Sequence, residues 1–474
     1  MAEQLETRLL IGGRWLESGK RLPVIDPYSG RVIAEVAVSD GSHVEQAVAA
    51  AEASGMSSLT GAQRHEILLK VSAEIERRGG ELTRLIVAES GKPLRYAAGE
   101  VERSAQTFSF AADEARRLHG ETLELDAHPG GKGYFGFYHR FPLGVIAAIS
   151  PFNFPLNLVA HKVAPALAAG NSVVLKPSSE TPLIALKLAQ IIQDAGAPAG
   201  ALNVLVGSGS TVGQALVAHP RVKMVTFTGS LEVGQIIRGS AGLKRVTLEL
   251  GSNSAVVVED GARLEQAAAR CLVGAFAFSG QVCISVQRIL LNRRLAESFL
   301  EIFLPGVEAL NRGDPGLETT EIGPMITEAE ARRVERWVAD AVGQGARVLV
   351  GGKREGAFYQ PTVLDRVKPG MDIYSKEAFA PIVCLETYDD FEQALARVND
   401  SSYGLQAGVF TESLDKAMIA FRRLEVGGVV INDFPTFRVD QMPYGGVKGS
   451  GSGREGPRFA VEEMTEIKLC CLRL

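Results

Sequence analysis

The sequence predicts an α/β fold with a parallel sheet covered on both faces. Between residues 145 and 250, short apolar segments of strand length alternate with segments of helical periodicity, and a second alternating block runs from about Ser254 to Asn432. The strand segments are apolar along their whole length, as parallel strands are when helices cover both faces of their sheet. The 474 residues, 46% of them hydrophobic, are enough for two to three domains with sizeable cores.

The chain before the first block divides into three parts. Residues 9–36 combine short apolar segments with turn residues, which predicts strands. In residues 41–118 the apolar side chains recur at helical spacing. Residues 119–140 contain several glycines and closely spaced aromatic residues, which predicts a β-hairpin that leaves the first domain.

Within the first block, predicted strands and helices follow one another regularly. The predicted strands are Val145–Ile149, Ser172–Lys176, Leu202–Val206, Val222–Phe227 and Val246–Leu250, and the first two predicted helices are Leu156–Ala168 and Pro182–Ala195. Residues 465–470 predict one more strand near the end of the chain.

The charge balance argues against a nucleic-acid partner. Lysine and arginine number 50 against 55 acidic residues, so no basic surplus exists to neutralise a phosphate backbone. No apolar run reaches the roughly 18 residues of a membrane span. Residues 1–6 lack the basic start and apolar core of a signal peptide. We therefore expect a cytoplasmic protein with neither a nucleic-acid nor a membrane partner.

The cysteines predict neither disulfides nor a metal site. They number five, which is odd, and form no C-x-x-C pair. Such usage is typical of a reducing compartment. The five are Cys271, Cys283, Cys384, Cys470 and Cys471.

Cys283, Glu249 and Asn153 together supply the groups that a covalent catalyst of carbonyl chemistry needs. A thiolate attacks, a carboxylate takes protons, and an amide N–H stabilises the oxyanion. Each residue has an ordinary alternative: a cysteine after an apolar helical run can be core filler, Glu249 a surface charge at a strand end, and Asn153 a helix cap. Because Glu249 stands between two leucines on a strand predicted to be central, the catalytic interpretation is favoured.

Three segments of the first block are candidates for binding a dinucleotide. Residues 207–213 read G-x-G-x-x-x-G, one residue longer than the standard fingerprint, and a strand-to-helix turn is the alternative. Phe-Thr-Gly-Ser at 227–230 opens a helix whose free N–H groups can hold a pyrophosphate, with an ordinary capped helix as the alternative. Lys176 ends a strand, where α/β sheets bind ligands, and could bond ribose hydroxyls or a 2′-phosphate; the alternative is a surface lysine.

In their order along the chain, these segments resemble the aldehyde dehydrogenase superfamily over essentially the whole length. The matching motifs are Pro-Phe-Asn-Phe-Pro at 151–155 (oxyanion segment), Lys-Pro-Ser at 176–178 (adenosine ribose), Phe-Thr-Gly-Ser at 227–230 (pyrophosphate turn), Leu-Glu-Leu-Gly at 248–251 (general base), Gly-Gln-Val-Cys at 280–283 (nucleophile), Lys-Glu-Ala-Phe-Ala-Pro at 376–381 (the E-x-F-G-P segment) and Pro-Tyr-Gly-Gly-Val-Lys at 443–448 (C-terminal glycine segment).

The resemblance implies an aldehyde dehydrogenase-like α/β fold with two Rossmann-type parallel-sheet domains plus an oligomerisation β-hairpin. It places a cofactor-binding domain at residues 1–120 and 141–250 and a catalytic domain at 251–440. The oligomerisation segments would be residues 121–140 and 441–474. Members of the family are dimers or tetramers, so a homodimer or homotetramer is expected.

The resemblance also implies site roles. Cys283 would be the nucleophile, Glu249 the general base and Asn153 an oxyanion donor. Glu377 would hold the nicotinamide ribose, and Phe379 would pack beside the nicotinamide. The full expected cofactor-binding set is Ser150, Phe152, Lys176, Ser178, Ser179, Gly209, Gly213, Phe227, Gly229, Ser230, Leu250, Glu377 and Phe379.

The expected cofactor is NAD or NADP, with the preference undecided. Many NAD-preferring members have a glutamate at the position of Ser179, and a carboxylate there would repel a 2′-phosphate. A serine would not, but Glu180 follows directly.

The expected substrate is a small-molecule aldehyde that the sequence does not identify. Arg103 and Arg438 could hold an anionic tail, or Arg438 could be a structural ion-pair partner. The segment 437–443 looks like the branch that includes lactaldehyde-type dehydrogenases. The residues expected near the aldehyde, which favour an apolar or aromatic pocket, are Phe154, Leu158, Val282, Ile284 and Phe437.

The implied reaction is NAD(P)-dependent oxidation of an aldehyde to a carboxylic acid, of EC 1.2.1 type. It would pass through a thiohemiacetal and a thioester on Cys283, and Glu249 would activate the hydrolytic water. Three alternatives stay open. A CoA-acylating enzyme usually lacks the base at the position of Glu249, an esterase needs no nucleotide segments, and a non-catalytic binding or structural member needs no complete catalytic set.

Overall fold

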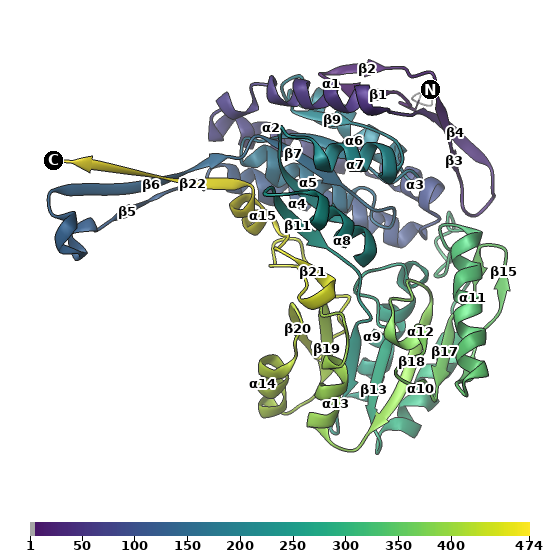
Figure 1. Ribbon diagram of the computed structural model, residues 1–474. Helices are drawn as coiled ribbons and strands as arrows, with labels where there is room; N and C mark the ends of the chain where they lie inside the picture. Colours follow the sequence, from purple (N-terminus) through teal and green to yellow (C-terminus); the bar gives the residue numbers. More distant parts are fainter. Residues whose placement is uncertain (1–4) are drawn as a thin grey trace.

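The computed structural model describes residues 5–474. Residues 1–4 lie outside the described residues. The expected cofactor domain begins there, and these residues are also part of the segment that is expected to lack the features of a signal peptide. Two large sheets organise the molecule, and a thin arm extends from its body (Figure 1). The predicted α/β fold with two Rossmann-type sheets is confirmed.

The first sheet has the strand order β2-β1-β9-β8-β7-β10-β11-β21. Strands β9 to β11 are parallel, and the strands outside them pair antiparallel. The chain runs from β7 through β8 to β9 and then returns to place β10 beside β7, which opens a crevice at the carboxyl ends of β7 and β10. The strands are β1 (Leu9–Ile11), β2 (Arg14–Leu16), β7 (Val145–Ile149), β8 (Ser172–Lys176), β9 (Leu202–Val204), β10 (Val222–Thr228), β11 (Arg245–Glu249) and β21 (Gly451–Ser452).

Both faces of this sheet are buried, as the continuous apolar strands predicted. In β7, Ile146 and Ala148 pack into a core with α2 to α6, whereas Val145, Ala147 and Ile149 pack into another with α1, α7 and α8. The helices of this half are α1 (Gly41–Glu52), α2 (Gly61–Arg77), α3 (Gly79–Ser90), α4 (Leu94–Ala115), α5 (Asn157–Ala168), α6 (Leu183–Asp194), α7 (Gln214–Ala218), α8 (Leu231–Ser240) and α15 (Pro457–Glu463).

One detail of the predicted sheet was wrong. The strand that ends at Glu249 is not central, because only the two-residue strand β21 lies beyond β11. Glu249 is nevertheless 3% exposed. The C-terminal glycine segment covers it: Leu250 donates its N–H to the carbonyl of Ser450, and Gly445 lies close to the Glu249 carboxyl group.

The second sheet has the order β14-β17-β18-β13-β12-β19-β20 and is parallel except for β14. Its strands are β12 (Ala255–Val258), β13 (Arg288–Asn292), β14 (Arg347–Val350), β17 (Thr362–Asp365), β18 (Ile382–Tyr388), β19 (Gln406–Phe410) and β20 (Gly428–Ile431). Its helices are α9 (Leu264–Phe276), α10 (Ala296–Glu308), α11 (Glu328–Gly343), α12 (Asp372–Ser375), α13 (Phe391–Asn399) and α14 (Leu414–Arg423).

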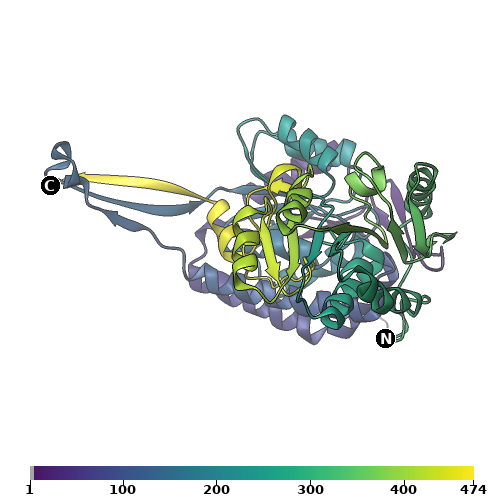
Figure 2. The same cartoon turned by 90° about the horizontal axis from the view of Figure 1, so that it is seen from below.

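Smaller sheets complete the fold. The arm is a three-stranded antiparallel sheet in the order β22-β6-β5, and it extends away from the body in both views (Figures 1 and 2). Its strands are β5 (Glu121–Leu123), β6 (Tyr134–Pro142) and β22 (Thr465–Arg473). Two hairpins lie elsewhere, β3 (Arg21–Ile25) with β4 (Val32–Ala37) and β15 (Arg354–Glu355) with β16 (Phe358–Tyr359).

Candidate active site

Two adjoining cavities meet at Cys283. The larger, of about 600 Å³, is lined by residues at the carboxyl ends of β7, β10 and β11 and by residues of the second half of the chain. The smaller, of about 210 Å³, lies on the other side of the cysteine. Cys283 and Leu158 line both cavities, so the sulfur lies where the contents of the two can meet.

A strained turn delivers Cys283 to this position. The apolar helical run before Cys283, which the sequence predicts from Leu272 to Phe278, ends two residues earlier, at Phe276. Three of the next residues lie in the left-handed region: Phe278, Ser279 and Gly280, with φ of 49°, 54° and 68°. A non-glycine residue in this region costs about 1–3 kcal/mol. Ser279 offsets part of that cost because its hydroxyl donates to the carbonyl of Gly323 at 2.7 Å. A side chain at position 280 would collide with the carbonyl of Ala380.

Asn153 is fixed against the backbone that precedes Cys283. Its side-chain Nδ2 donates to the carbonyl of Gln281 at 2.9 Å, and the residue is 2% exposed. The segment that carries it leads into α5, whose first N–H groups, from Leu156 and Asn157, donate to the buried carboxylate of Glu100. An amide nitrogen has two hydrogens. The second hydrogen of Asn153 is available to a ligand in the larger cavity, which Asn153 lines.

Glu249 ends β11 and faces the same cavity. Neither carboxyl oxygen has a hydrogen-bond partner among the described residues, and both are buried. Burial, together with the negative charge of Glu455, raises the pKa of Glu249 well above its usual value. Gly445 makes room for it, because a Cβ at that position would lie 2.9 Å from Glu249 Oε1. A buried carboxyl group without a partner faces an open cavity here, which is suitable for holding a water molecule.

Glu455 is the centre of a buried charge network beside Glu249. Lys162 Nζ lies 2.8 Å from Glu455 Oε1 and donates to Thr228 Oγ1 at 2.6 Å. Arg438 donates to Glu455 Oε2 at 3.1 Å and lies 3.0 Å from His161 Nε2. Burial alone would keep Glu455 neutral, but Lys162, His161 and Arg438 lower its pKa to about 2. Lys162 therefore bonds neither Asn153 nor Glu249, and Arg438 has the structural ion pair that was one of its two expected roles.

Cys283 has a hydrogen-bond partner that the sequence did not indicate. Its Sγ lies 2.9 Å from the hydroxyl of Tyr444, and the guanidinium of Arg438 lies 3.7 Å from the centre of the Tyr444 ring. Burial raises the pKa of the Cys283 thiol to about 11, while Tyr444 and Arg438 act in the opposite direction. Tyr444 was recognised only as part of a glycine motif, and its partner lies 161 positions away in the sequence.

Six of the expected cofactor residues line the larger cavity: Phe152, Gly229, Ser230, Leu250, Glu377 and Phe379. Phe152 and Phe379 contact each other edge to face with ring centres 5.8 Å apart. The carboxylate of Glu377 accepts a hydrogen bond from the N–H of Ser252 at 3.1 Å and packs against Gly251 so closely that a side chain there would collide with it. Burial raises the pKa of Glu377 to about 7.

Four more expected cofactor residues line a third cavity of about 320 Å³ beside α8: Lys176, Gly209, Gly213 and Phe227. Lys176 Nζ donates to the carbonyls of Pro177 and Gly207, and burial lowers its pKa to about 8. Residues 209–213 form a π-helical turn that opens into α7. Ser150, Ser178 and Ser179 line none of these cavities, although the buried hydroxyl of Ser150 has no partner among the described residues.

These features fit a dinucleotide. The larger cavity and the third cavity both lie along the carboxyl edge of the first sheet, where its topological switch point is. The N-terminus of α8, capped by Ser230, lies between them with free N–H groups suited to phosphate. Lys176 lines the third cavity and Glu377 lines the larger one, so the two residues would contact different ends of a bound dinucleotide. The buried Ser150 hydroxyl, which has no partner among the described residues, follows β7.

The smaller cavity has a distinctive charge pattern. Lys92, Arg103 and Arg438 line it, and none of the described lining residues is acidic. The partner carboxylates, Glu100 of Lys92 and Asp440 of Arg103, do not line it. Of the expected substrate residues, Phe154, Leu158, Val282 and Ile284 line this cavity, whereas Phe437 does not and is 42% exposed.

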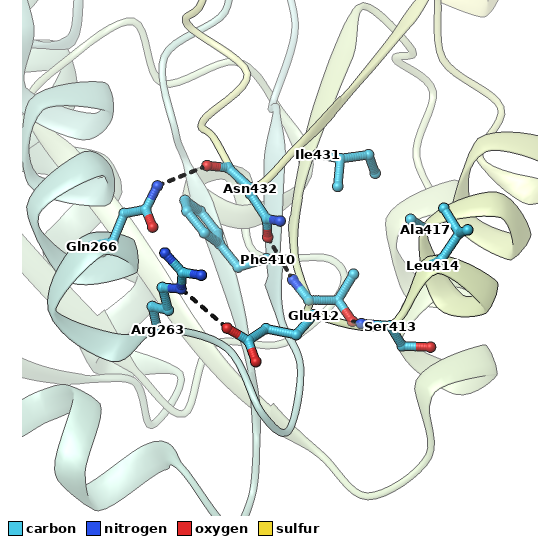
Figure 3. A pocket seen from close by; sticks show the side chains of 10 residues that line it. Arg263, Gln266, Phe410, Glu412, Ser413, Leu414, Ala417, Ile431 and Asn432 are labelled. Atoms are coloured by element: carbon cyan, nitrogen blue, oxygen red, sulfur yellow. Dashed lines mark hydrogen bonds and ion pairs between the residues drawn. The ribbon is translucent and has the colours of Figure 1, made fainter.

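Another cavity, of about 580 Å³, lies at the carboxyl ends of β19 and β20 (Figure 3). The polar groups around it bond one another: Arg263 pairs with Glu412 at 3.0 Å, and Asn432 accepts from Gln266 and from the N–H of Thr411. None of the expected site residues is among the described residues that line it.

Within residues 5–474, no helix combines the length and the apolar character needed to cross a membrane.

Comparison with known proteins agrees with this geometry. The model of the aldehyde dehydrogenase family matches residues 15–470. The chain is 46% identical to the 3-sulfolactaldehyde dehydrogenase of Priestia aryabhattai over 466 residues, and the matched region covers 98% of each chain. It is 40% identical to the lactaldehyde dehydrogenase of Methanococcus aeolicus, over 97% of this chain and 98% of that protein.

Solved structures give the same result. The crystal structure of aldehyde dehydrogenase 21 from Physcomitrella patens, in complex with the reaction product succinate, superposes with a TM-score of 0.97 at 40% identity. The match covers 100% of this chain and 99% of that one.

Proposed function

Because the chain belongs to the aldehyde dehydrogenase family, we propose that Cys283, Glu249 and Asn153 carry out its reaction and that its substrates are short aldehydes with an anionic group. The protein oxidises aldehydes to carboxylic acids with NAD or NADP. The observation that supports these roles best is the position of Cys283 at the junction of the two cavities, with Asn153 and Glu249 lining the larger one.

In the proposed mechanism, Cys283 gives its thiol proton to ionised Glu249, directly or through water, and Sγ attacks the aldehyde carbonyl carbon as a thiolate. The oxyanion that forms accepts hydrogen bonds from Asn153 Nδ2 and from the backbone N–H of Cys283, donors that preorganise the site for the transition state. Phe152, Phe379 and Glu377 orient the nicotinamide end of the cofactor, which accepts a hydride when bound.

The second half of the reaction depends on Glu249. Loss of hydride from the thiohemiacetal leaves a thioester on Cys283, which water must cleave. Glu249, once ionised, removes a proton from that water as it attacks. Its burial and lack of hydrogen-bond partners support this role, because a carboxylate without bound donors is a stronger base than a solvated one.

The charge pattern of the smaller cavity supports an anionic substrate. Lys92, Arg103 and Arg438 line this cavity of about 210 Å³ and none of its described lining residues is acidic, so a sulfonate or carboxylate there would be stabilised. Arg103 is the most accessible candidate for direct contact, with 28% of its side chain exposed. Relatives named for 3-sulfolactaldehyde and a structure holding succinate point to the same class.

The decisive experiment is formation of reduced cofactor, followed by absorbance with NAD and NADP in parallel. We expect turnover of 3-sulfolactaldehyde and succinic semialdehyde, with the neutral aldehydes lactaldehyde and butyraldehyde as poorer substrates. Cys283→Ala should abolish activity. Turnover that requires added CoA and gives an acyl-CoA would instead identify the CoA-acylating reaction, and no turnover of any aldehyde would contradict the proposal.

A paired substitution tests the anionic group. A hydrogen bond to a charged group contributes about 1.5–3 kcal/mol, so Arg103→Gln should lower kcat/KM for anionic aldehydes about 10- to 100-fold. It should leave butyraldehyde almost unaffected. Arg95, also on α4, pairs with Glu321 and lines neither cavity, so Arg95→Gln is the control. Equal losses for anionic and neutral aldehydes would refute the substrate class.

We further propose a cytoplasmic homodimer or homotetramer assembled through the arm. The arm exposes apolar side chains that a monomer leaves in water, including Phe135, Phe141, Ile467 and Leu469. Leu469→Asp should lower the mass measured by light scattering, whereas Leu317→Asp on the body should not. All five cysteines are free, which suits a reducing compartment. Cell fractionation tests the location.

A further inference from the structure

We propose that Tyr444 is a hydrogen-bond donor to the Cys283 nucleophile, holding its sulfur in place and stabilising it as the thiolate. The inference rests on the proposed role of Cys283. It is carried by the distance of 2.9 Å between Tyr444 Oη and Cys283 Sγ, at the junction of the two cavities. Tyr444 is only 2% exposed.

The direction of the hydrogen bond follows from the protonation states. When both groups are neutral, either can donate. A thiolate has no hydrogen and can only accept, so Tyr444 must then be the donor. Burial raises the pKa of Tyr444 well above its usual value, which favours the protonated hydroxyl that this hydrogen bond needs.

The Tyr444 ring is held on several sides. Its backbone pairs with Glu455, with the N–H of Tyr444 donating to the carbonyl of Glu455 at 3.1 Å. The Arg438 guanidinium lies 3.7 Å from the ring centre, and Glu455 and His161 hold that guanidinium. A donor fixed in this way needs no reorganisation when charge develops on the sulfur.

The position of Arg438 adds to the effect. A cation over the face of a phenol draws electron density from the ring and makes the hydroxyl a stronger donor. Arg438 also attracts the thiolate directly, through its positive charge. Glu377 and Glu249 act against ionisation of the sulfur when they are charged. Lys92 and Arg103 line the same cavity as the sulfur, but Tyr444 is its hydrogen-bond partner, and Tyr444 and Arg438 lower its pKa while burial raises it.

The test is the pH dependence of Cys283 alkylation by iodoacetamide, measured in the full-length protein without cofactor or aldehyde. Peptide mass spectrometry separates alkylation of Cys283 from that of the other cysteines, of which Cys271 and Cys384 are buried. Because no turnover is needed, a failure of the proposed aldehyde chemistry would leave this result readable.

We expect Tyr444→Phe to raise the apparent pKa of the Cys283 thiol by about one unit and to slow its alkylation below that pKa about tenfold. Tyr359→Phe is the matched control: Tyr359 is also buried, its hydroxyl has no partner among the described residues, and it lines neither cavity at Cys283. An alkylation profile in Tyr444→Phe that coincides with wild type would overturn the proposal.

A second variant guards against a folding defect in Tyr444→Phe. Replacing Tyr444 by 3-fluorotyrosine keeps the hydroxyl but makes it more acidic and a stronger donor. The apparent pKa of Cys283 should then fall below the wild-type value. A fluorotyrosine protein with an unchanged or higher Cys283 pKa would refute the donor role, whatever happens to the phenylalanine variant.

Discussion

Glu249 and Glu455 are two buried carboxyl groups of one site whose pKa values are displaced in opposite directions. Burial raises the pKa of Glu249, and the charge of Glu455 raises it further. Glu455 resists the same effect of burial because Lys162, His161 and Arg438 lower its pKa to about 2. Glu455 is therefore the ionised partner of the network, and Glu249 is the carboxyl group that holds its proton more strongly.

This relationship predicts the pH dependence of turnover. The base is active only when ionised, so kcat limited by thioester hydrolysis should rise as the pH increases through the pKa of Glu249. Glu455→Gln removes the charge that raises this pKa and leaves Lys162 and Arg438 uncompensated, so the acid limb of the kcat profile should move to lower pH. Glu462→Gln, at an exposed position of α15, should leave the limb in place. If the acid limb of the kcat profile in Glu455→Gln stayed at the same pH or moved to higher pH, the proposed effect of the Glu455 charge on Glu249 would be contradicted.

Asn153→Ala should lower kcat/KM about 10²- to 10³-fold, because one oxyanion donor is typically worth about 3–4 kcal/mol. The loss should appear in single-turnover formation of reduced cofactor, since the donor acts when the thiol attacks. Asn292→Ala removes a buried asparagine amide outside the site, which bonds Glu259 at 2.9 Å. It should affect stability more than catalysis. If the two variants lost activity equally, the role of Asn153 would be structural.

Much of this site could be predicted because its parts follow strands. Ser150, Lys176, Gly229 and Leu250 each come directly after or at the end of a parallel strand, and the apolar runs mark those strands almost to the residue. Carboxyl ends of parallel strands meet at one edge, so the sequence alone predicts that these four residues lie near one another.

The substrate side could not be predicted in the same way. Lys92, just before α4, lies far in the sequence from Arg438 and Tyr444, and only the packing of these two segments against Cys283 brings them to one cavity. The left-handed turn before Cys283 also escaped prediction, because Phe278 and Ser279 have no intrinsic preference for that conformation and are held there by tertiary contacts.

Ser179→Glu should favour NAD over NADP. The Ser179 hydroxyl donates to the carbonyl of Gly207 at 3.1 Å, beside the cavity that Lys176 and Gly209 line. A carboxylate at this position would repel a 2′-phosphate, and we expect kcat/KM for NADP to fall about tenfold relative to NAD. Glu180 is exposed, so Glu180→Gln should leave the ratio of the two cofactors unchanged. If Glu180→Gln shifted the ratio and Ser179→Glu did not, the neighbouring carboxylate would be the determinant.

The buried pair of Lys92 and Glu100 predicts a stability effect. Both side chains are fully buried and bonded to each other, and Lys92 also lies over the rings of Phe154 and Phe278. Glu100 additionally accepts the first N–H groups of α5. Glu100→Ala leaves a buried ammonium and two backbone donors without their acceptor, so unfolding should become easier by about 3–5 kcal/mol. Urea denaturation followed by circular dichroism measures the change.

Two further variants separate the charge from the helix cap at Glu100. Glu100→Gln keeps a side-chain oxygen that can still accept from Leu156 and Asn157 but removes the charge that Lys92 needs. It should therefore cost less than Glu100→Ala. Glu328→Ala breaks an exposed pair with Arg332 on α11 and should leave the urea midpoint unchanged, because exposed ion pairs add little. If Glu100→Ala were as stable as Glu328→Ala, the Lys92–Glu100 pair would not be what holds α5 in place. The position of the Asn153 segment beside Cys283 would then depend on other contacts.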